Sequence, residues 1–183
     1  MYEVELKFRV ADVEAIERRL AGLAATFGAP VEQVDRYFAH PCRDFAVADE
    51  ALRLRQAGES LAITWKGPKV DAATKTRREI ELPLAGYGPA TMEHWTGLLA
   101  ALGFETVREV VKRRRTAGLD WQGGRVELAL DHVHGLGDFL EIETQAAAAD
   151  LPAARARVES LAHALGCTDA ERRSYLELVL GSG

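Results

Sequence analysis

Hydrophobic and charged residues alternate without interruption at the start of the chain. One parity is apolar and consists of Val4, Leu6, Phe8 and Val10. The other parity is charged and consists of Glu3, Glu5, Lys7 and Arg9. Because successive side chains of a β-strand point to opposite faces, this pattern predicts a strand over residues 2–10 with one apolar and one charged face.

Similar extended patterns follow along the chain and predict strands over residues 31–40, 51–56, 61–66, 74–84, 104–119, 124–133 and 138–145. Residues 67–73 are expected to form a loop. Apolar residues at helical spacing predict amphipathic helices over residues 11–25, 92–102 and 151–165, with a short fourth helix over 169–180. Strands that mostly follow one another, with helices interposed, favour an antiparallel sheet in an α+β fold.

The charged face of the first strand recurs in later strands. The positions that alternate there with apolar residues are Arg53, Arg55, Lys66, Lys75, Arg77, Glu79, Glu81, Lys112, Arg114, Arg125, Glu127, Asp131, Glu141 and Glu143. These charges either point to water around an apolar core, or point into a closed barrel whose apolar exterior is covered by the helices. Periodicity alone fits both arrangements. The apolar helix stripes and the mixture of Arg with Glu favour the inward arrangement, which suits a polyanion held with divalent cations.

Composition narrows the class of protein. A chain of 183 residues with 48% hydrophobic and 28% charged residues is expected to form a single globular domain over 1–183. The net charge of −5 argues against nucleic acid as a partner. Cys42 and Cys167 match no metal-ligand spacing and are expected to be free thiols in a cytoplasmic protein. Charges from Glu3 onward and the lack of a long apolar run argue against a leader peptide and a membrane span.

Several motifs together resemble the CYTH superfamily of triphosphate tunnel enzymes. Glu3-x-Glu5-x-Lys7 is similar to its ExExK signature. The resemblance extends over nearly the whole chain, through Leu52-Arg-Leu-Arg55, Trp65-Lys-Gly-Pro68, Arg78-Glu-Ile-Glu81, Lys112-x-Arg114 and the segment from Leu130 to Glu143. Both ends of the chain, including Arg173-Ser-Tyr-Leu-Glu-Leu178, resemble the class IV adenylate cyclase branch most closely.

The resemblance implies a closed, eight-stranded antiparallel β-barrel that forms an open tunnel with a polar lumen, and a homodimer in the cyclase branch. It therefore turns the charged strand faces inward, with the amphipathic helices outside. One departure concerns the His-Phe pair that class IV cyclases often carry shortly before ExExK. The sequence given starts at Met1 and leaves no room for this pair, which weakens the cyclase assignment more than the superfamily one.

Basic residues of the tunnel are the expected phosphate ligands, because Arg donates bidentate hydrogen bonds to phosphate oxygens and Lys supplies a point charge. The candidates are Lys7, Arg53, Arg55, Lys66, Arg77, Lys112 and Arg114. Arg78 replaces Arg77 if a bulge shifts the parity of that strand.

Acidic residues of the tunnel are expected to bind Mg²⁺ or Mn²⁺, which prefer hard oxygen ligands and bridge to phosphate. The metal candidates are Glu3, Glu5, Glu141 and Glu143, followed by Glu79, Glu81 and Asp131. Glu79 and Glu81 alternatively only pair with tunnel arginines. Lys7 or a carboxylate such as Glu79, Glu81 or Asp131 is a candidate for assisting proton transfer, although the sequence identifies no general base.

Two reactions fit such a site. In cyclisation, the ribose 3′-hydroxyl of ATP attacks the α-phosphorus and pyrophosphate leaves. In hydrolysis, water attacks the γ-phosphorus of tripolyphosphate, thiamine triphosphate or a nucleoside triphosphate. A polyphosphate- or nucleotide-binding module without turnover is the third possibility, and it is disfavoured because the acidic set is complete.

Overall fold

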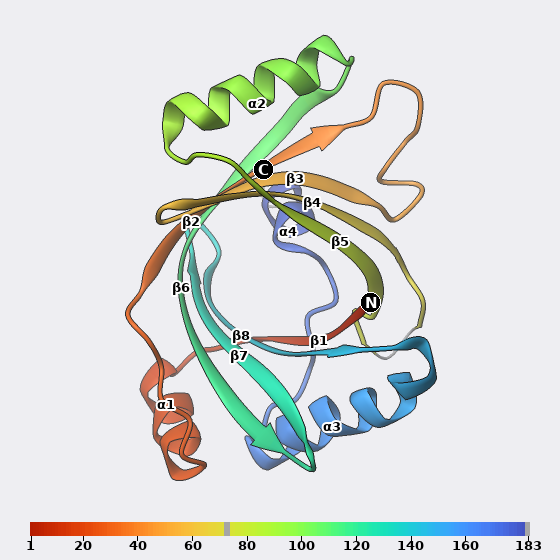
Figure 1. Ribbon diagram of the computed structural model, residues 1–183. Helices are drawn as coiled ribbons and strands as arrows, with labels where there is room; N and C mark the ends of the chain where they lie inside the picture. Colours follow the sequence, from red (N-terminus) through yellow and green to blue (C-terminus); the bar gives the residue numbers. More distant parts are fainter. Residues whose placement is uncertain (72–73, 182–183) are drawn as a thin grey trace.

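Eight antiparallel strands close into a barrel in the computed structural model, which describes residues 1–71 and 74–181 (Figure 1). The strands are β1 (Tyr2–Arg9), β2 (Val31–Ala39), β3 (Ala51–Ala57), β4 (Ser60–Lys69), β5 (Arg77–Leu84), β6 (Glu105–Trp121), β7 (Gly124–Val133) and β8 (Gly137–Ala146). The helices are α1 (Val13–Gly22), α2 (Pro89–Ala101), α3 (Leu151–Ala164) and α4 (Tyr175–Leu180), with a 3₁₀ turn, η1, over Ala148–Asp150. The predicted α+β class and eight-stranded barrel are confirmed.

The strands follow one another around the barrel in the order β1-β5-β4-β3-β2-β6-β7-β8. The ladder between β1 and β5 is the shortest, with only the pairs Tyr2–Arg78 and Glu3–Arg77. Beyond it, the backbone N–H of Lys75 donates to the carbonyl of Glu5 at 2.9 Å, and that of Glu171 donates to the carbonyl of Lys7 at 2.7 Å. The segment that leads to α4 therefore extends the wall of the barrel beside β1.

Two apolar clusters cover the outside of the barrel, as the amphipathic patterns predict. The first joins the outer face of β1 with α1 and α3, and its fully buried members include Val4, Leu20 and Leu161. The second joins β3 and β4 with α2 through residues such as Leu54 and Leu99. Trp121 packs against the first cluster, and Trp65 and Trp95 pack against the second.

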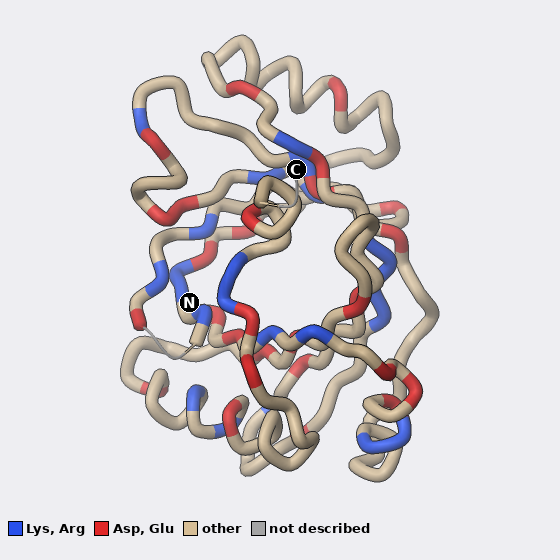
Figure 2. The backbone as a smooth tube through the Cα atoms, turned by 180° about the vertical axis from the view of Figure 1, so that it is seen from behind, with Lys and Arg blue, Asp and Glu red and all other residues tan. Residues whose placement is uncertain are grey.

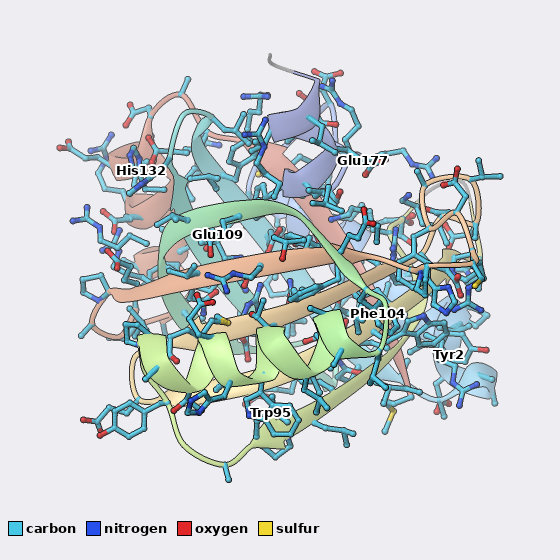
Figure 3. The ribbon with its side chains drawn as sticks, turned by 90° about the horizontal axis from the view of Figure 1, so that it is seen from above. Tyr2, Trp95, Phe104, Glu109, His132 and Glu177 are labelled. Atoms are coloured by element: carbon cyan, nitrogen blue, oxygen red, sulfur yellow. The ribbon has the colours of Figure 1, made fainter. Side chains whose placement is uncertain are left out.

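Polar contacts fix α2 to the barrel as well. Arg36, on the outer face of β2, donates to Thr96 of α2 at 2.8 Å and pairs with Glu93 of the same helix at 2.7 Å. Its guanidinium also contacts Glu109 of β6, and Figure 3 shows Glu109 beside α2 on this side of the molecule. One arginine thus links two strands and a helix.

The borders of β4 and β5 differ from the prediction for physical reasons that the structure shows. β4 continues to Lys69 through Gly67 and Pro68, because a register shift between Lys66 and Lys69 accommodates the proline. β5 begins at Arg77, since the side chain of Asp71 accepts from the backbone and hydroxyl of Thr74 and forms a turn there. Residues 72 and 73 of the expected loop lie outside the described residues.

The C-terminal helix also differs from the prediction. It begins only at Tyr175 because Ser174 and Glu177 form a capping box at its start. Instead of covering the outside of the barrel, α4 lies over one end of it (Figure 1). No described helix is long and apolar enough to cross a membrane.

Candidate functional site

The charged parity of the strands faces the interior of the barrel. The interior holds a cavity of about 1160 Å³, and Figure 2 shows basic and acidic positions distributed around the ring of strands. The predicted site residues that line this cavity are Glu3, Glu5, Arg53, Arg55, Lys66, Arg77, Glu79, Glu81, Lys112, Arg114, Glu141 and Glu143. Arg78 is exposed on the outside, so Arg77 holds the inward position.

Three carboxylates gather on the β1–β8 side of the lumen. Glu5 lies directly opposite Glu143 in the β1–β8 ladder, and an oxygen from each of Glu3, Glu5 and Glu143 lies within 4.8 Å of the others. Within the described chain, no basic side chain pairs with Glu143. Burial and then the charge of Glu3 raise the pKa of Glu143 to about 8. Lysines pair with Glu3 and Glu5, and Glu143 is the carboxylate of this cluster whose charge is not offset by an ion pair within the described residues.

The fourth metal candidate, Glu141, lies in a different environment. Its carboxylate accepts a hydrogen bond from Arg114, which also donates to Asp131 through Nε at 2.7 Å and Nη2 at 2.5 Å. Although burial opposes ionisation, the charges of Arg114 and Lys112 hold the pKa of Glu141 well below its usual range. The structure therefore groups three of the four metal candidates and places Glu141 with the arginine.

The arginines of β3 share one buried carboxylate that the sequence analysis missed. Asp35 of β2 accepts from Arg55 at 2.6 and 2.7 Å and from Arg53 at 3.4 Å. Burial alone would raise the pKa of Asp35, but the charges of Arg55 and Arg53 outweigh it and hold the pKa well below the ordinary value. The alternation of β2 could have identified Asp35, because it shares the inward parity of this strand with Gln33 and Tyr37.

The acids of β5 neutralise a lysine and bind a hydroxyl. Glu79 lies opposite Lys66 in the β4–β5 ladder, and the ammonium of Lys66 contacts Glu79 at 2.8 Å and Glu3 at 2.7 Å. Glu81 accepts from the hydroxyl of Thr64 at 2.9 Å. Neither acid belongs to the cluster of Glu3, Glu5 and Glu143.

Lys75 is a second residue absent from the predicted set. It precedes β5 on the same parity as Arg77, and its ammonium contacts Glu5 at 2.6 Å. Arg77 itself contacts Asp49 at 3.4 Å, which lies in the loop between β2 and β3 with a φ of 52°. Asp49 also accepts from Lys69, so this carboxylate, which lines the cavity, holds two basic residues.

Two predicted residues, Lys7 and Asp131, lie beneath α4 and do not line the cavity. The ammonium of Lys7 is fully buried and donates to the carbonyl of Arg173. Burial, with the charge of Lys75, lowers the pKa of Lys7 to about 7. Asp131 is buried too and accepts from Tyr175 at 2.9 Å. Lys7 therefore has no open path to a phosphate in the cavity of this structure, and its direct contact with phosphate stays a prediction.

The basic residues of the lumen are otherwise paired with its acids. Arg53 still has a buried Nε without a hydrogen-bond partner in the described part of the chain. The oxygens of a triphosphate would accept hydrogen bonds from the basic side chains. A divalent cation would then bind the carboxylates that these side chains release. The lumen can therefore exchange internal ion pairs for a bound anion and a bound cation together.

The donor set of Glu3, Glu5 and Glu143 fits a hard divalent cation. It offers only carboxylate oxygens, as Mg²⁺ and Mn²⁺ prefer. Two of these carboxylates face each other directly across a ladder, where like charges repel, and Lys75 offsets the charge of Glu5 but makes no ion pair with Glu143 among the described residues. Such an ion would supply charge to stabilise phosphate oxygens.

Comparison with known proteins agrees with this geometry. The family model described as "CYTH domain" matches residues 1–175. The curated protein "Putative adenylate cyclase MJ0240" of Methanocaldococcus jannaschii is 36% identical over 143 residues, which cover 78% of this chain and 77% of that protein. "Adenylate cyclase CyaB" of Aeromonas hydrophila is 29% identical over 183 residues, covering 97% of this chain and 88% of that protein.

Among solved structures, the PH1819 protein from Pyrococcus horikoshii OT3 is 38% identical and superimposes with a TM-score of 0.86. The match covers 99% of both chains. The family model covers almost the whole sequence, and the barrel with its inward charges is the fold that the resemblance implied. The chain therefore belongs to the CYTH family of triphosphate tunnel proteins.

Proposed function

We propose that this protein is a divalent-metal-dependent enzyme that acts on a nucleoside triphosphate, and that it converts ATP to cyclic AMP and pyrophosphate. The observation that carries the proposal is the lumen, in which arginines and lysines stand across from a cluster of three carboxylates. The names of the relatives from Methanocaldococcus and Aeromonas support cyclisation over other triphosphate reactions.

The basic residues that line the cavity are assigned to the triphosphate. Transfer of a phosphoryl or nucleotidyl group depends mainly on positioning and on stabilising charge. Arg53, Arg77 and Arg114 present guanidinium groups from three different strands, which lets them contact different oxygens of one chain of phosphates. Lys66, Lys75 and Lys112 add point charges beside them.

Glu3, Glu5 and Glu143 are assigned to the metal ion, Mg²⁺ or Mn²⁺. Glu141 orients Arg114 in this proposal, and Asp35 orients Arg53 and Arg55. Arg55 is therefore a weaker phosphate ligand than Arg53, because Asp35 already engages its Nε and one terminal nitrogen.

The cavity accommodates more than a chain of phosphates. Beyond the charged ring it continues along α4 and the loop between β2 and β3, where Phe45, Leu176 and Leu180 line it. An organic group can occupy this less charged part. In the cyclisation, the bond from O3′ to the α-phosphorus forms, the bond from that phosphorus to the bridging oxygen breaks, and pyrophosphate carries away the electron pair. The proton of the 3′-hydroxyl passes to a base or to solvent.

The test is a product analysis with purified protein, Mg²⁺ or Mn²⁺, and three separate substrates: ATP, tripolyphosphate and thiamine triphosphate. Formation of cyclic AMP and pyrophosphate in equal amounts is the expected result. Orthophosphate from any of the substrates selects the hydrolytic alternative, which uses the same lumen. Absence of turnover with all three substrates contradicts an enzymatic role and leaves a binding module.

The assembly is a separate proposal. Homodimer formation is expected only from resemblance to the cyclase branch, and sedimentation of the purified protein tests it. A monomer at assay concentrations would contradict the homodimer without affecting the assignment of the lumen.

A further inference from the structure

The short helix α4 lies over part of one opening of the barrel and lines the cavity. Its side chains Tyr175 and Leu178 pack against Val110, Val133 and Phe139, which project from β6, β7 and β8. Figure 1 shows α4 over the barrel opening, and Figure 3 shows Glu177 of this helix on the side of the barrel away from Trp95. The helix therefore forms part of the wall of the candidate site.

Tyr175 makes the polar contacts of this wall. Its side chain is buried, and its hydroxyl donates to Asp131 at 2.9 Å. Its ring packs edge-on against Phe139, with the centroids 5.1 Å apart. The ammonium of Lys7 lies 4.1 Å from the centroid of the ring, and that of Lys112 lies 5.0 Å from it. One aromatic residue thus contacts two buried cations and one buried carboxylate.

Asp131 transmits the effect of this contact to an arginine of the lumen. It holds Arg114 through two hydrogen bonds and lies 3.3 Å from the ammonium of Lys112. Tyr175 supplies a further donor, from outside the barrel strands. Because a buried carboxylate is costly unless its hydrogen bonds are satisfied, loss of this hydroxyl favours a rotation of Asp131. The fork of Arg114 would then turn with it.

The two lysines depend on the ring in a different way. Burial and the nearby charge of Arg114 lower the pKa of Lys112 to about 8. The face of an aromatic ring attracts a cation, most strongly where water is excluded. The ring therefore holds both ammonium groups in place, and Tyr175 lines the cavity whereas Lys7 does not.

We propose that Tyr175 is a positioning residue of the CYTH lumen, whose hydroxyl orients Asp131 and Arg114 and whose ring orients Lys112 for a bound triphosphate. This inference rests on the proposed function, because it assigns the phosphate chain to the same basic residues. A positioning role can be told apart from a purely structural role of α4, because removal of the Tyr175 hydroxyl alone should then lower the affinity for the ligand.

The test compares Tyr175→Phe and Tyr175→Leu with Val179→Ala, a control that lies on the same helix and in the same apolar cluster. Tripolyphosphate with Mn²⁺ is titrated into each protein by calorimetry, and thermal unfolding is recorded in parallel. Tyr175→Phe keeps the ring and should weaken binding about tenfold, the effect of one hydrogen bond to a charged group. Tyr175→Leu loses ring and hydroxyl and should weaken binding roughly a hundredfold.

The outcomes separate this inference from the proposed function. If both Tyr175 variants bind like Val179→Ala, or bind more tightly than the wild type, Tyr175 is only a packing residue or an obstruction and the inference is overturned. Wild-type protein that binds no tripolyphosphate overturns the proposed function as well. If the wild type is active, kcat/KM should fall in Tyr175→Leu and should fall less in Tyr175→Phe, which keeps the ring. This order supports a positioning role.

Discussion

Glu5 of β1 and Glu143 of β8 lie directly opposite each other inside the barrel. Like charges at such a position repel, and Glu143 gains no basic partner within the described residues. Lys75 pairs with Glu5 and Lys66 pairs with Glu3, so Glu143 is the member of this set of three carboxylates that a bound cation would neutralise. This relationship distinguishes the lumen from an ordinary network of ion pairs.

Glu143→Gln should abolish specific Mn²⁺ binding while the fold is retained, because the amide preserves the shape but removes the charge. Turnover should fall by roughly a hundredfold or more, since loss of residues that merely support metal ligands already costs about 10- to 100-fold. Calorimetric titration with Mn²⁺ and initial rates measure both effects.

Glu159→Gln is the matched control, because Glu159 is exposed on α3. It should bind Mn²⁺ and turn over substrate like the wild type. Equal Mn²⁺ affinity in Glu143→Gln and in the wild type would place the metal elsewhere.

Adjacent arginines offer a second matched pair. Arg77 lines the cavity, whereas Arg78 is exposed. Arg77→Ala should weaken tripolyphosphate binding about 10- to 100-fold, the range for hydrogen bonds to a charged group, and Arg78→Ala should leave it unchanged. Calorimetry on both variants provides the comparison. A stronger effect of Arg78→Ala would mean that the parity of β5 is reversed.

Asp35→Asn should destabilise the protein by about 3 kcal/mol at pH 7, because it leaves Arg53 and Arg55 buried without their shared carboxylate. The pKa of Asp35 is depressed in the folded state. Its stabilising contribution is therefore present above the unfolded pKa of about 4 and is lost as the pH falls towards the folded pKa.

Urea unfolding at pH 7, 5, 4 and 3 measures this contribution. The difference in stability between the wild type and Asp35→Asn should be constant from pH 7 to 5 and should shrink below about pH 4. A difference that stays the same down to pH 3 would show that Asp35 is not held ionised by its arginines.

The sequence carried enough information for the barrel and for most of its lumen. Alternation located every strand, and the resemblance to the CYTH family decided that the charges point inward, which periodicity alone did not decide. Alternation alone could not decide whether Arg77 or Arg78 points inward, because a bulge in β5 would move every later side chain to the other face. The irregular register falls between Lys66 and Lys69 of β4 instead.

Other features depended on packing between distant segments. Asp35 has the inward parity of its strand, but its role appears only when β2 and β3 place it beside two arginines. The predicted C-terminal helix has a recognisable apolar face, yet no pattern indicates which surface that face covers. The structure brings Tyr175 to Asp131, 44 positions earlier in the chain.

We propose that the lumen exchanges its internal ion pairs for a bound triphosphate and a bound metal. Since each ligand frees groups that the other needs, the two should bind cooperatively, and the coupling must be the same in both directions. Calorimetric titration of tripolyphosphate with and without Mg²⁺, and of Mg²⁺ with and without tripolyphosphate, tests this directly, after correction for Mg²⁺–tripolyphosphate association in solution. We predict an affinity gain of about tenfold or more in each direction, within the usual range of such coupling. Independent binding of the two ligands, or no binding of tripolyphosphate, would contradict it.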